Sequence, residues 1–126
     1  MLQIDIMSRT PVYEQISSQL EKLISAGILK EGEQLPSVRS LSIELSVNPN
    51  TIQKAYGELD VRGIIGSVPG KGCFVMPGAR EKLRTIAKSR LSEIKILASE
   101  LIAAGVTKEE ITRVIDSITP EKEEIK

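Results

Sequence analysis

Two helix-start signals follow each other closely in the middle of this chain. Ser37, directly after Pro36, offers a hydroxyl cap for a short helix. Asn48 offers a second cap, and Pro49 suits the first helical position because its missing N–H would have no partner there. The sequence leaves room for only a tight turn between the two helices, so it predicts a helix-turn-helix. The apolar positions of the two helices are Val38, Leu41 and Leu45, then Ile52, Ala55, Tyr56 and Leu59.

A glycine-tipped hairpin is predicted after the second of these helices. Gly63 ends the helix, and apolar residues at 64–65, 68 and 74–75 indicate two short strands. Gly70, Lys71 and Gly72 form the turn between them. Helix, turn, helix and hairpin in this order predict a winged helix-turn-helix, which we place at residues 1–78 with its core at 11–77.

An additional helix is predicted before this unit. Thr10 is expected to cap it with its hydroxyl, and Pro11 to occupy its first turn. Alternating apolar residues at positions 2, 4 and 6 indicate a short extended arm ahead of it. The apolar stripe of the helix is Tyr13, Ile16, Leu20, Leu23 and Ile24.

Residues 79–126 have a purely helical pattern, which we expect to form a two-helix dimerisation extension. The first helix is predicted to run unbroken to Ala104-Gly105, and a capping box at Thr107 starts the second. Pro120 is expected to stop it before a frayed, charged tail at 121–126. A wide apolar face on a helix outside a finished domain requires a partner, for which we expect a second copy. The expected dimer contacts are Leu83, Ala87, Leu91, Ile94, Ala98 and Leu101. The fold class is thus mainly α with a small β-hairpin wing.

The polar face of the second helix of the helix-turn-helix suits the edges of DNA bases. Asn and Gln pair with adenine in the major groove, and Thr can bond to bases or touch a thymine methyl. Asn48 is equally well explained as a cap alone. Lys71 at the hairpin tip is expected to reach DNA, and the flanking glycines allow close approach of the backbone. The expected DNA contacts are Ser37, Arg39, Asn48, Asn50, Thr51, Gln53, Lys54, Gly70, Lys71 and Gly72, with Arg80, Lys82 and Arg84 as further phosphate contacts.

Composition argues against most other classes of function. The chain has no histidine and one cysteine, so the commonest general base and thiolate metal clusters are missing, and we expect no enzyme activity, cofactor or metal. Cys73 is interpreted as a small apolar residue rather than a redox switch. No signal peptide or membrane span is expected, which predicts a cytoplasmic protein. Net charge is zero, but residues 79–95 carry six basic and two acidic side chains, a net of +4, whereas residues 1–78 carry seven and eight, a net of −1.

The segments 32–39, 41–45, 47–59, 63–65 and 70–75 resemble the GntR superfamily of bacterial transcription factors. The opening at 11–16 and the stretch 47–51 resemble its YtrA-like branch in particular. The resemblance implies a homodimeric winged-helix regulator that binds inverted-repeat operators, with a short helical C-terminal unit for dimerisation. It carries DNA contacts over to Arg39, Asn48, Asn50, Thr51, Gln53 and Gly70. A repressor of a nearby transporter operon is the function that it suggests.

Two other functions fit parts of the sequence. The near-neutral first domain suits a winged-helix module that binds protein rather than DNA. The C-terminal helices suit a ligand-responsive switch, although two short helices are expected to enclose less than the ~300 Å³ of a typical pocket. A dimer seam is therefore the preferred interpretation of the apolar positions from Ile86 to Ile102.

Overall fold

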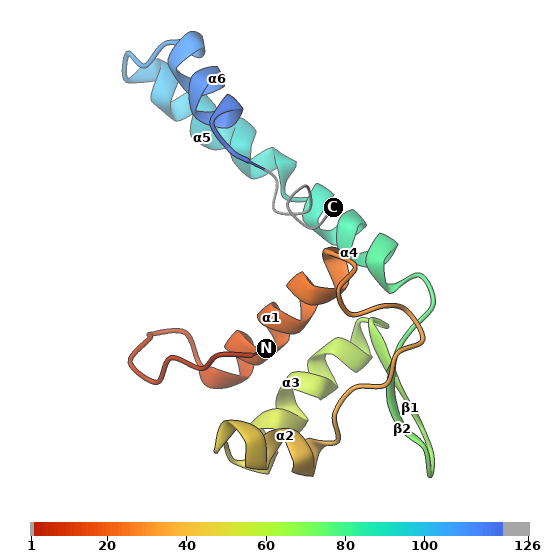
Figure 1. The fold of residues 1–126 in the computed structure, drawn as a ribbon. Coiled ribbons are helices and arrows are strands. Elements are labelled where there is room, and N and C mark those ends of the chain that lie inside the picture. The colour runs from red at the N-terminus through yellow and green to blue at the C-terminus, as the bar shows by residue number, and fades with distance from the viewer. Residues whose placement is uncertain (1, 120–126) are drawn as a thin grey trace. The chain divides into compact units, whose positions relative to one another are not determined.

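The computed structural model describes residues 2–119 and is mostly helical with one two-stranded antiparallel hairpin (Figure 1). This is the predicted fold class. The chain divides into two compact units, the first ending at Arg84 and the second beginning at Thr85. The elements are α1 Val12–Ser25, α2 Val38–Leu45, α3 Pro49–Val61, β1 Ile65–Val68, β2 Gly72–Val75, α4 Ala79–Lys88, α5 Leu91–Ala103 and α6 Lys108–Asp116.

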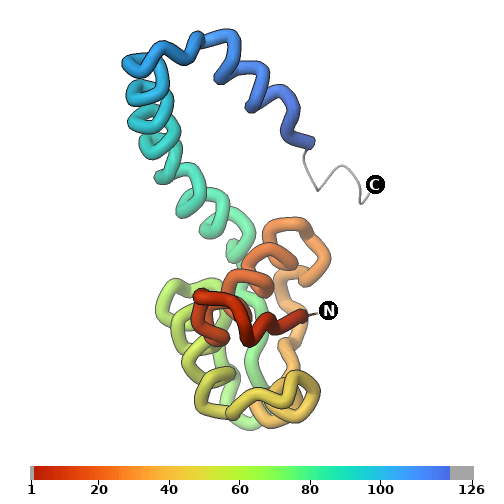
Figure 2. The backbone as a smooth tube through the Cα atoms, turned by 90° about the vertical axis from the view of Figure 1, so that its left-hand side faces the viewer, coloured from red at the N-terminus to blue at the C-terminus, as the bar shows by residue number. Residues whose placement is uncertain are grey.

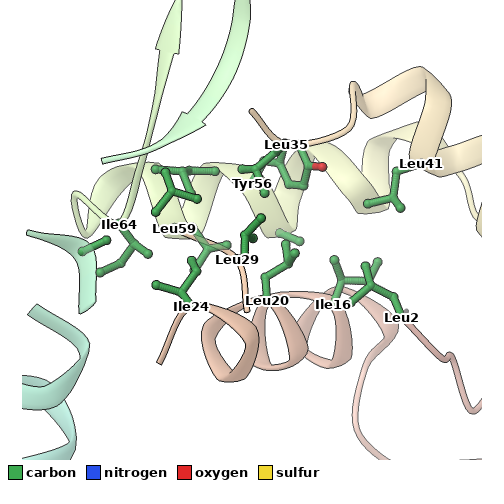
Figure 3. Packing of buried hydrophobic residues seen from close by; sticks show 14 of the residues in the cluster. Leu2, Ile16, Leu20, Ile24, Leu29, Leu35, Leu41, Tyr56, Leu59 and Ile64 are labelled. Carbon is green, nitrogen blue, oxygen red and sulfur yellow. The ribbon is translucent and has the colours of Figure 1, made fainter. Parts of the chain in front are cut away.

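The first unit has a core of aliphatic side chains between α1 and α3. Ile16, Leu20 and Ile24 of α1 point toward Tyr56 and Leu59 of α3 (Figure 3). These are the stripes that the helical spacing predicted, and the side chains of the set are at most 6% exposed. Burial of each large apolar side chain in this core contributes roughly 1.5–3 kcal/mol to the stability of the folded state. The other buried members are Leu2, Leu29, Leu35, Leu41, Ile52, Ala55, Ile64, Ile65, Val75, Ala79 and Leu83.

The start of α1 differs from the prediction. Pro11 is the N-cap residue, and no side chain caps the helix, so the expected Thr10 hydroxyl cap is wrong. The amide of Gln15 instead reaches back and donates to the carbonyls of Thr10 and Asp5. The N-terminal arm forms no strand and lies along α1 (Figure 2), where Leu2 is buried and Gln19 pairs with the backbone of residue 3.

The turn between α2 and α3 is closed by backbone and side-chain hydrogen bonds that the sequence analysis did not predict. The Ser46 N–H donates to the carbonyl of Ile43, and the Val47 N–H to that of Ser42. These two bonds form a Schellman motif. This motif requires a residue in the left-handed conformation, which is usually glycine. In this chain the position is occupied by Ser46, with a φ of +55°. The buried Ser42 hydroxyl donates to the Val47 carbonyl, which fixes the direction in which the chain enters α3.

The region after the hairpin departs from the sequence analysis at Leu83 and at the junction between α4 and α5. Leu83 is only 7% exposed and lies in the core of the first unit, so it is not available as the dimer contact that we expected. The division between the two compact units falls inside α4, after Arg84, whereas we place the end of the winged domain at Gly78. The predicted long helix is also broken, because α4 ends at Lys88 and α5 starts at Leu91. The Ser89 hydroxyl donates to the Ile86 carbonyl at this break and competes with the helical ladder.

The second unit contains α5 and α6, joined by a turn at Gly105. The predicted capping box is present: the Thr107 hydroxyl accepts from the Glu110 N–H, and the Glu110 carboxylate accepts from the Thr107 N–H. The predicted stop at Pro120 and the charged tail lie outside the described residues.

Replacing the left-handed serine tests the closure of the helix-turn-helix. We expect Ser46→Gly to raise the free energy of unfolding by roughly 0.5–1 kcal/mol, because glycine adopts a positive φ without a Cβ penalty. Urea denaturation measures the change. Ser40→Gly inside α2 is the matched control, and it should lower stability by a similar amount. A loss of stability in both variants would contradict the strain assigned to Ser46.

Candidate nucleic-acid interface

The first turn of α3 presents polar side chains on a helix whose start is fixed by Asn48. The Asn48 side-chain oxygen accepts from the Asn50 N–H at 2.8 Å, so Asn48 is a helix cap as predicted. This bond uses one of the two lone pairs of the Asn48 side-chain oxygen and leaves the two N–H donors of the amide for other partners. Asn50, Gln53 and Lys54 are exposed and Thr51 is half-buried.

Lys54 is held by an aromatic ring on α1. Its ammonium lies 4.0 Å from the centroid of the Tyr13 ring, a cation–π contact between the two helices. The Tyr13 hydroxyl donates to the Glu14 carboxylate, and this bond raises the pKa of Tyr13. The ring keeps the lysine at the side of α3 next to the start of α1. The sequence did not predict this contact, because nothing in local spacing relates positions 13 and 54.

Residues at the start of α2 have two kinds of role. The Ser37 hydroxyl accepts from the Ser40 N–H at 3.0 Å and caps α2, which leaves its O–H available to donate to an outside partner. Arg39 lies in the first turn of α2 and is exposed. Among the ion pairs formed within residues 2–119, none includes Arg39. Its guanidinium is therefore available to an anion.

The hairpin is the predicted wing, with β1 and β2 paired from Ile65 opposite Val75 to Val68 opposite Gly72. Gly70 and Gly72 have φ values of +77° and +119°, so the tip needs glycine at both positions. Lys71 between them is exposed. The predicted turn residues therefore stand where the sequence placed them.

The segment 32–35 adds a short third ribbon to the hairpin, which sequence reasoning missed. The Gly32 N–H donates to the Val75 carbonyl, the Val75 N–H to the Glu33 carbonyl, and the Leu35 N–H to the Cys73 carbonyl, at 2.8–2.9 Å. The Gln34 side chain donates to the carbonyl of Lys71 at 2.7 Å. The wing is thus attached to the segment that leads into α2.

A cleft of about 330 Å³ lies between the start of α2, α3 and the hairpin. Four of the predicted DNA contacts line it: Ser37, Gln53, Gly70 and Gly72. Asp60 and Cys73 also line it, and they give the cleft one acidic and one thiol group. The fold therefore brings residues from three separate segments to one surface. Arg39, Asn48, Asn50, Thr51, Lys54 and Lys71 are not among the lining residues.

Two titratable groups near the cleft are held in their neutral forms. The buried Tyr56 hydroxyl donates to the Pro36 carbonyl at 2.7 Å, and burial raises its pKa well above the ordinary value. Burial also raises the pKa of the Cys73 thiol, which disfavours the reactive thiolate. Cys73 packs against the core, in keeping with its interpretation as a small apolar residue.

All three predicted phosphate contacts after the hairpin have a partner within the chain. The Arg80 guanidinium donates to the Ser25 carbonyl at the end of α1, and the Lys82 ammonium donates to the Gly63 carbonyl just after α3. Both cations thus satisfy carbonyl groups at helix C-termini, where positive charge is favoured. Arg84 pairs with Glu81 one turn away. The positive charge that the sequence gathers after residue 78 is partly used to attach α4 to the first unit.

The second unit has an apolar groove of about 420 Å³ between α5 and α6. Ile94, Ala98 and Leu101, three of the predicted dimer contacts, line it, whereas Ala87 and Leu91 do not. The expectation that two short helices enclose less than a typical pocket volume is therefore wrong. No residue of α5 or α6 is buried in the single chain, and Leu91, Ile94, Ile96 and Leu97 are each more than half exposed.

Within residues 2–119, no group of three or more His, Cys, Asp or Glu side chains is arranged to hold a metal ion. In the same part of the chain, no helix has the length and apolar character required to cross a membrane.

A helix-turn-helix followed by a hairpin at the same surface defines the winged helix-turn-helix class of regulatory proteins. Residues 12–75 match the family described as "Bacterial regulatory proteins, gntR family". The chain belongs to the GntR family.

Relatives of similar length support the assignment over nearly the whole chain. The HTH-type transcriptional repressor YtrA of Bacillus subtilis (strain 168) is 40% identical over 123 residues, which cover 94% of this chain and 92% of that protein. A GntR family transcriptional regulator from Listeria monocytogenes superposes with a TM-score of 0.74 at 34% identity, covering 92% of this chain and all of that one. The DNA-binding domain of AraR in complex with operator ORX1 matches with a TM-score of 0.52 at 30% identity, covering 59% of this chain and 92% of that one.

The buried tyrosine gives stability a defined pH dependence. Above about pH 10 the unfolded chain loses the Tyr56 proton while the folded protein, whose Tyr56 pKa is raised, retains it. The folded state then binds more protons, so the free energy of unfolding falls as pH rises. Tyr56→Phe should be less stable than wild type by about 1 kcal/mol near neutral pH, through loss of the bond to Pro36. Its stability should fall less steeply above pH 10, as urea denaturation at several pH values would show. Equal slopes for the two proteins would contradict this assignment.

Proposed function

We propose that this protein is a homodimeric transcriptional repressor that binds an inverted-repeat operator through α3 and the wing. The observation that carries the proposal is the convergence of α2, α3 and the hairpin on one cleft that includes four of the predicted contact residues. Double-stranded DNA suits such a surface, because its major groove admits a helix and its adjacent minor groove a hairpin tip.

We infer separate tasks for the polar residues from the capping bonds. Asn50, Thr51 and Gln53 contact base edges, since their side chains are not used as caps. Asn48 and Ser37 each use one acceptor lone pair for a cap and keep their N–H or O–H donors, which they offer to a base acceptor or to a phosphate oxygen. Arg39, Lys54 and Lys71 supply positive charge to phosphates, with Lys54 held against Tyr13.

Dimerisation is supported by the apolar surface of the second unit. A helix with large apolar side chains around most of its circumference is stable only when covered. Both Leu97, which lines the groove, and Ile96, which does not, are more than half exposed in α5. A second copy of the chain is the partner that also explains two-fold operators, with recognition helices about one helical turn, ~34 Å, apart.

Repression is supported by the similarity to the Bacillus subtilis repressor, and a transporter operon as target is supported by the family resemblance alone. Occupancy of a promoter by the dimer would block transcription directly. The alternative of a protein-binding winged helix is favoured by the net charge of −1 on residues 1–78. It predicts binding with little salt dependence, so the experiment below separates the two.

The first test removes one proposed phosphate contact. We expect Arg39→Ala to weaken operator binding by roughly tenfold or more and to reduce the slope of log affinity against log salt by about 0.9. Binding would be measured by fluorescence anisotropy, with a duplex selected by the wild-type protein from a random library. Lys22→Ala removes an exposed charge in the last turn of α1, and it should leave both the affinity for the operator and the slope against salt unchanged. Failure to select any motif would reject DNA recognition, and equal binding by both variants would reject the role of Arg39.

A second test addresses the dimer. Leu97→Glu places a carboxylate in the apolar groove and should convert the dimer to monomer in sedimentation velocity, because an unpaired charge in an apolar interface is costly. Ser99→Glu introduces the same charge on α5 outside the groove lining and should remain dimeric. The monomeric variant should also lose high affinity for the two-fold operator but keep weak half-site binding. A wild-type protein with the mass of one chain would reject the proposed dimer.

A further inference from the structure

The tip of the wing is held from outside the hairpin by one glutamine side chain. Gln34 lies in the ribbon 32–35 that pairs with β2, and its amide donates to the Lys71 carbonyl at 2.7 Å. The other hydrogen bond of the described tip residues 69–71 runs from the Lys71 N–H to Val68, within the hairpin itself. Gln34 therefore provides the side-chain bond that links the tip to the rest of the first unit.

The two tip glycines differ in what surrounds them. At Gly72 the space that a Cβ would occupy is filled by the Gln34 amide, so an added methyl would displace that amide. At Gly70 no atom lies within 4 Å of the Cβ position, so only its φ of +77° demands glycine. One glycine thus makes room for Gln34, and the other keeps an open surface toward a partner.

A bond of this kind matters because the hairpin is short. Each strand has four residues, and an isolated two-stranded hairpin is only marginally stable in water. A tip without an external bond would sample several conformations, and binding DNA would have to pay for ordering them. The ribbon that carries Gln34 continues into the Ser37 cap of α2, so the same segment fixes both the wing and the start of the helix-turn-helix.

We propose that Gln34 is a positioning residue that holds Lys71 and the glycines of the wing tip in the conformation that contacts DNA. This inference rests on the proposed function, because it assigns the tip to the minor groove next to α3. Gln34 acts through the Lys71 carbonyl and needs no contact with DNA. Its substitution should weaken wing contacts selectively and leave the contacts of α3 in place.

The experiment compares Gln34→Met with Gln19→Met. Methionine has a similar length and no charge, so it removes the amide without adding repulsion toward phosphate. Gln19 is a matched control because its amide also donates to a backbone carbonyl, that of Gln3, and holds the N-terminal arm instead of the wing. Both proteins would be measured on the duplex selected by wild type. We expect Gln34→Met to bind roughly three- to tenfold more weakly and Gln19→Met to bind as wild type does.

Footprinting provides the readout that a general loss of stability would not produce. For Gln34→Met, hydroxyl-radical protection in the minor groove at the wing should disappear, whereas protection of guanine N7 from methylation in the major groove should persist. In the free protein, backbone ¹⁵N relaxation at residues 70–72 should show increased mobility. Unchanged protection and unchanged relaxation would overturn the proposal, as would equal loss in both grooves.

The proposed function can fail separately. If wild type itself protects no duplex, DNA recognition fails, and the relaxation measurement still decides whether Gln34 orders the tip. A rigid tip in Gln34→Met would then reject the positioning role as well.

Discussion

The backbone pairing between residues 32–35 and β2 is the interaction on which the rest of the first unit depends. It ties the hairpin to the chain just before α2, and Tyr56 ties α3 to the same place through the Pro36 carbonyl. Three elements that are separate in sequence are thus fixed to one short segment. Their relative positions define the cleft, so the geometry of the candidate interface is set by the backbone pairing with β2 and by the bond from the Tyr56 hydroxyl to Pro36.

Local signals in the sequence predicted those features that local physics determines. The caps at Ser37, Asn48 and Thr107 were correct because a hydroxyl or amide at the start of a helix needs only its own next turn as a partner. The stripe of α3 and the glycine turn of the wing were correct for the same reason. The polar face of α3 could be identified as a candidate site because the buried face was already assigned, which left few positions to point outward.

Sequence spacing did not reveal contacts with partners that lie far away in the chain. Arg80 and Lys82 remain predicted phosphate contacts, and each also donates to a backbone carbonyl, that of residue 25 and residue 63 respectively. Leu83 continued a helical stripe in the sequence, but it belongs to the core of the first unit. Gln34 had no pattern to mark it, because its partner is at the tip of a hairpin 37 positions later. The partners of such residues are decided by tertiary contacts, and the periodicity of the sequence carries no information about those contacts.

The absence of buried residues in α5 and α6 has a thermodynamic consequence for the molecule. The first unit has its own core, whereas the second draws little stability from within a single chain. The two units should therefore respond differently to heating. The first should unfold at a midpoint temperature that does not depend on protein concentration. The midpoint temperature of the second should rise with the concentration of the partner that covers its apolar surface. The chain thus combines a first unit that is stable by itself with a second unit whose folding depends on the concentration of its partner.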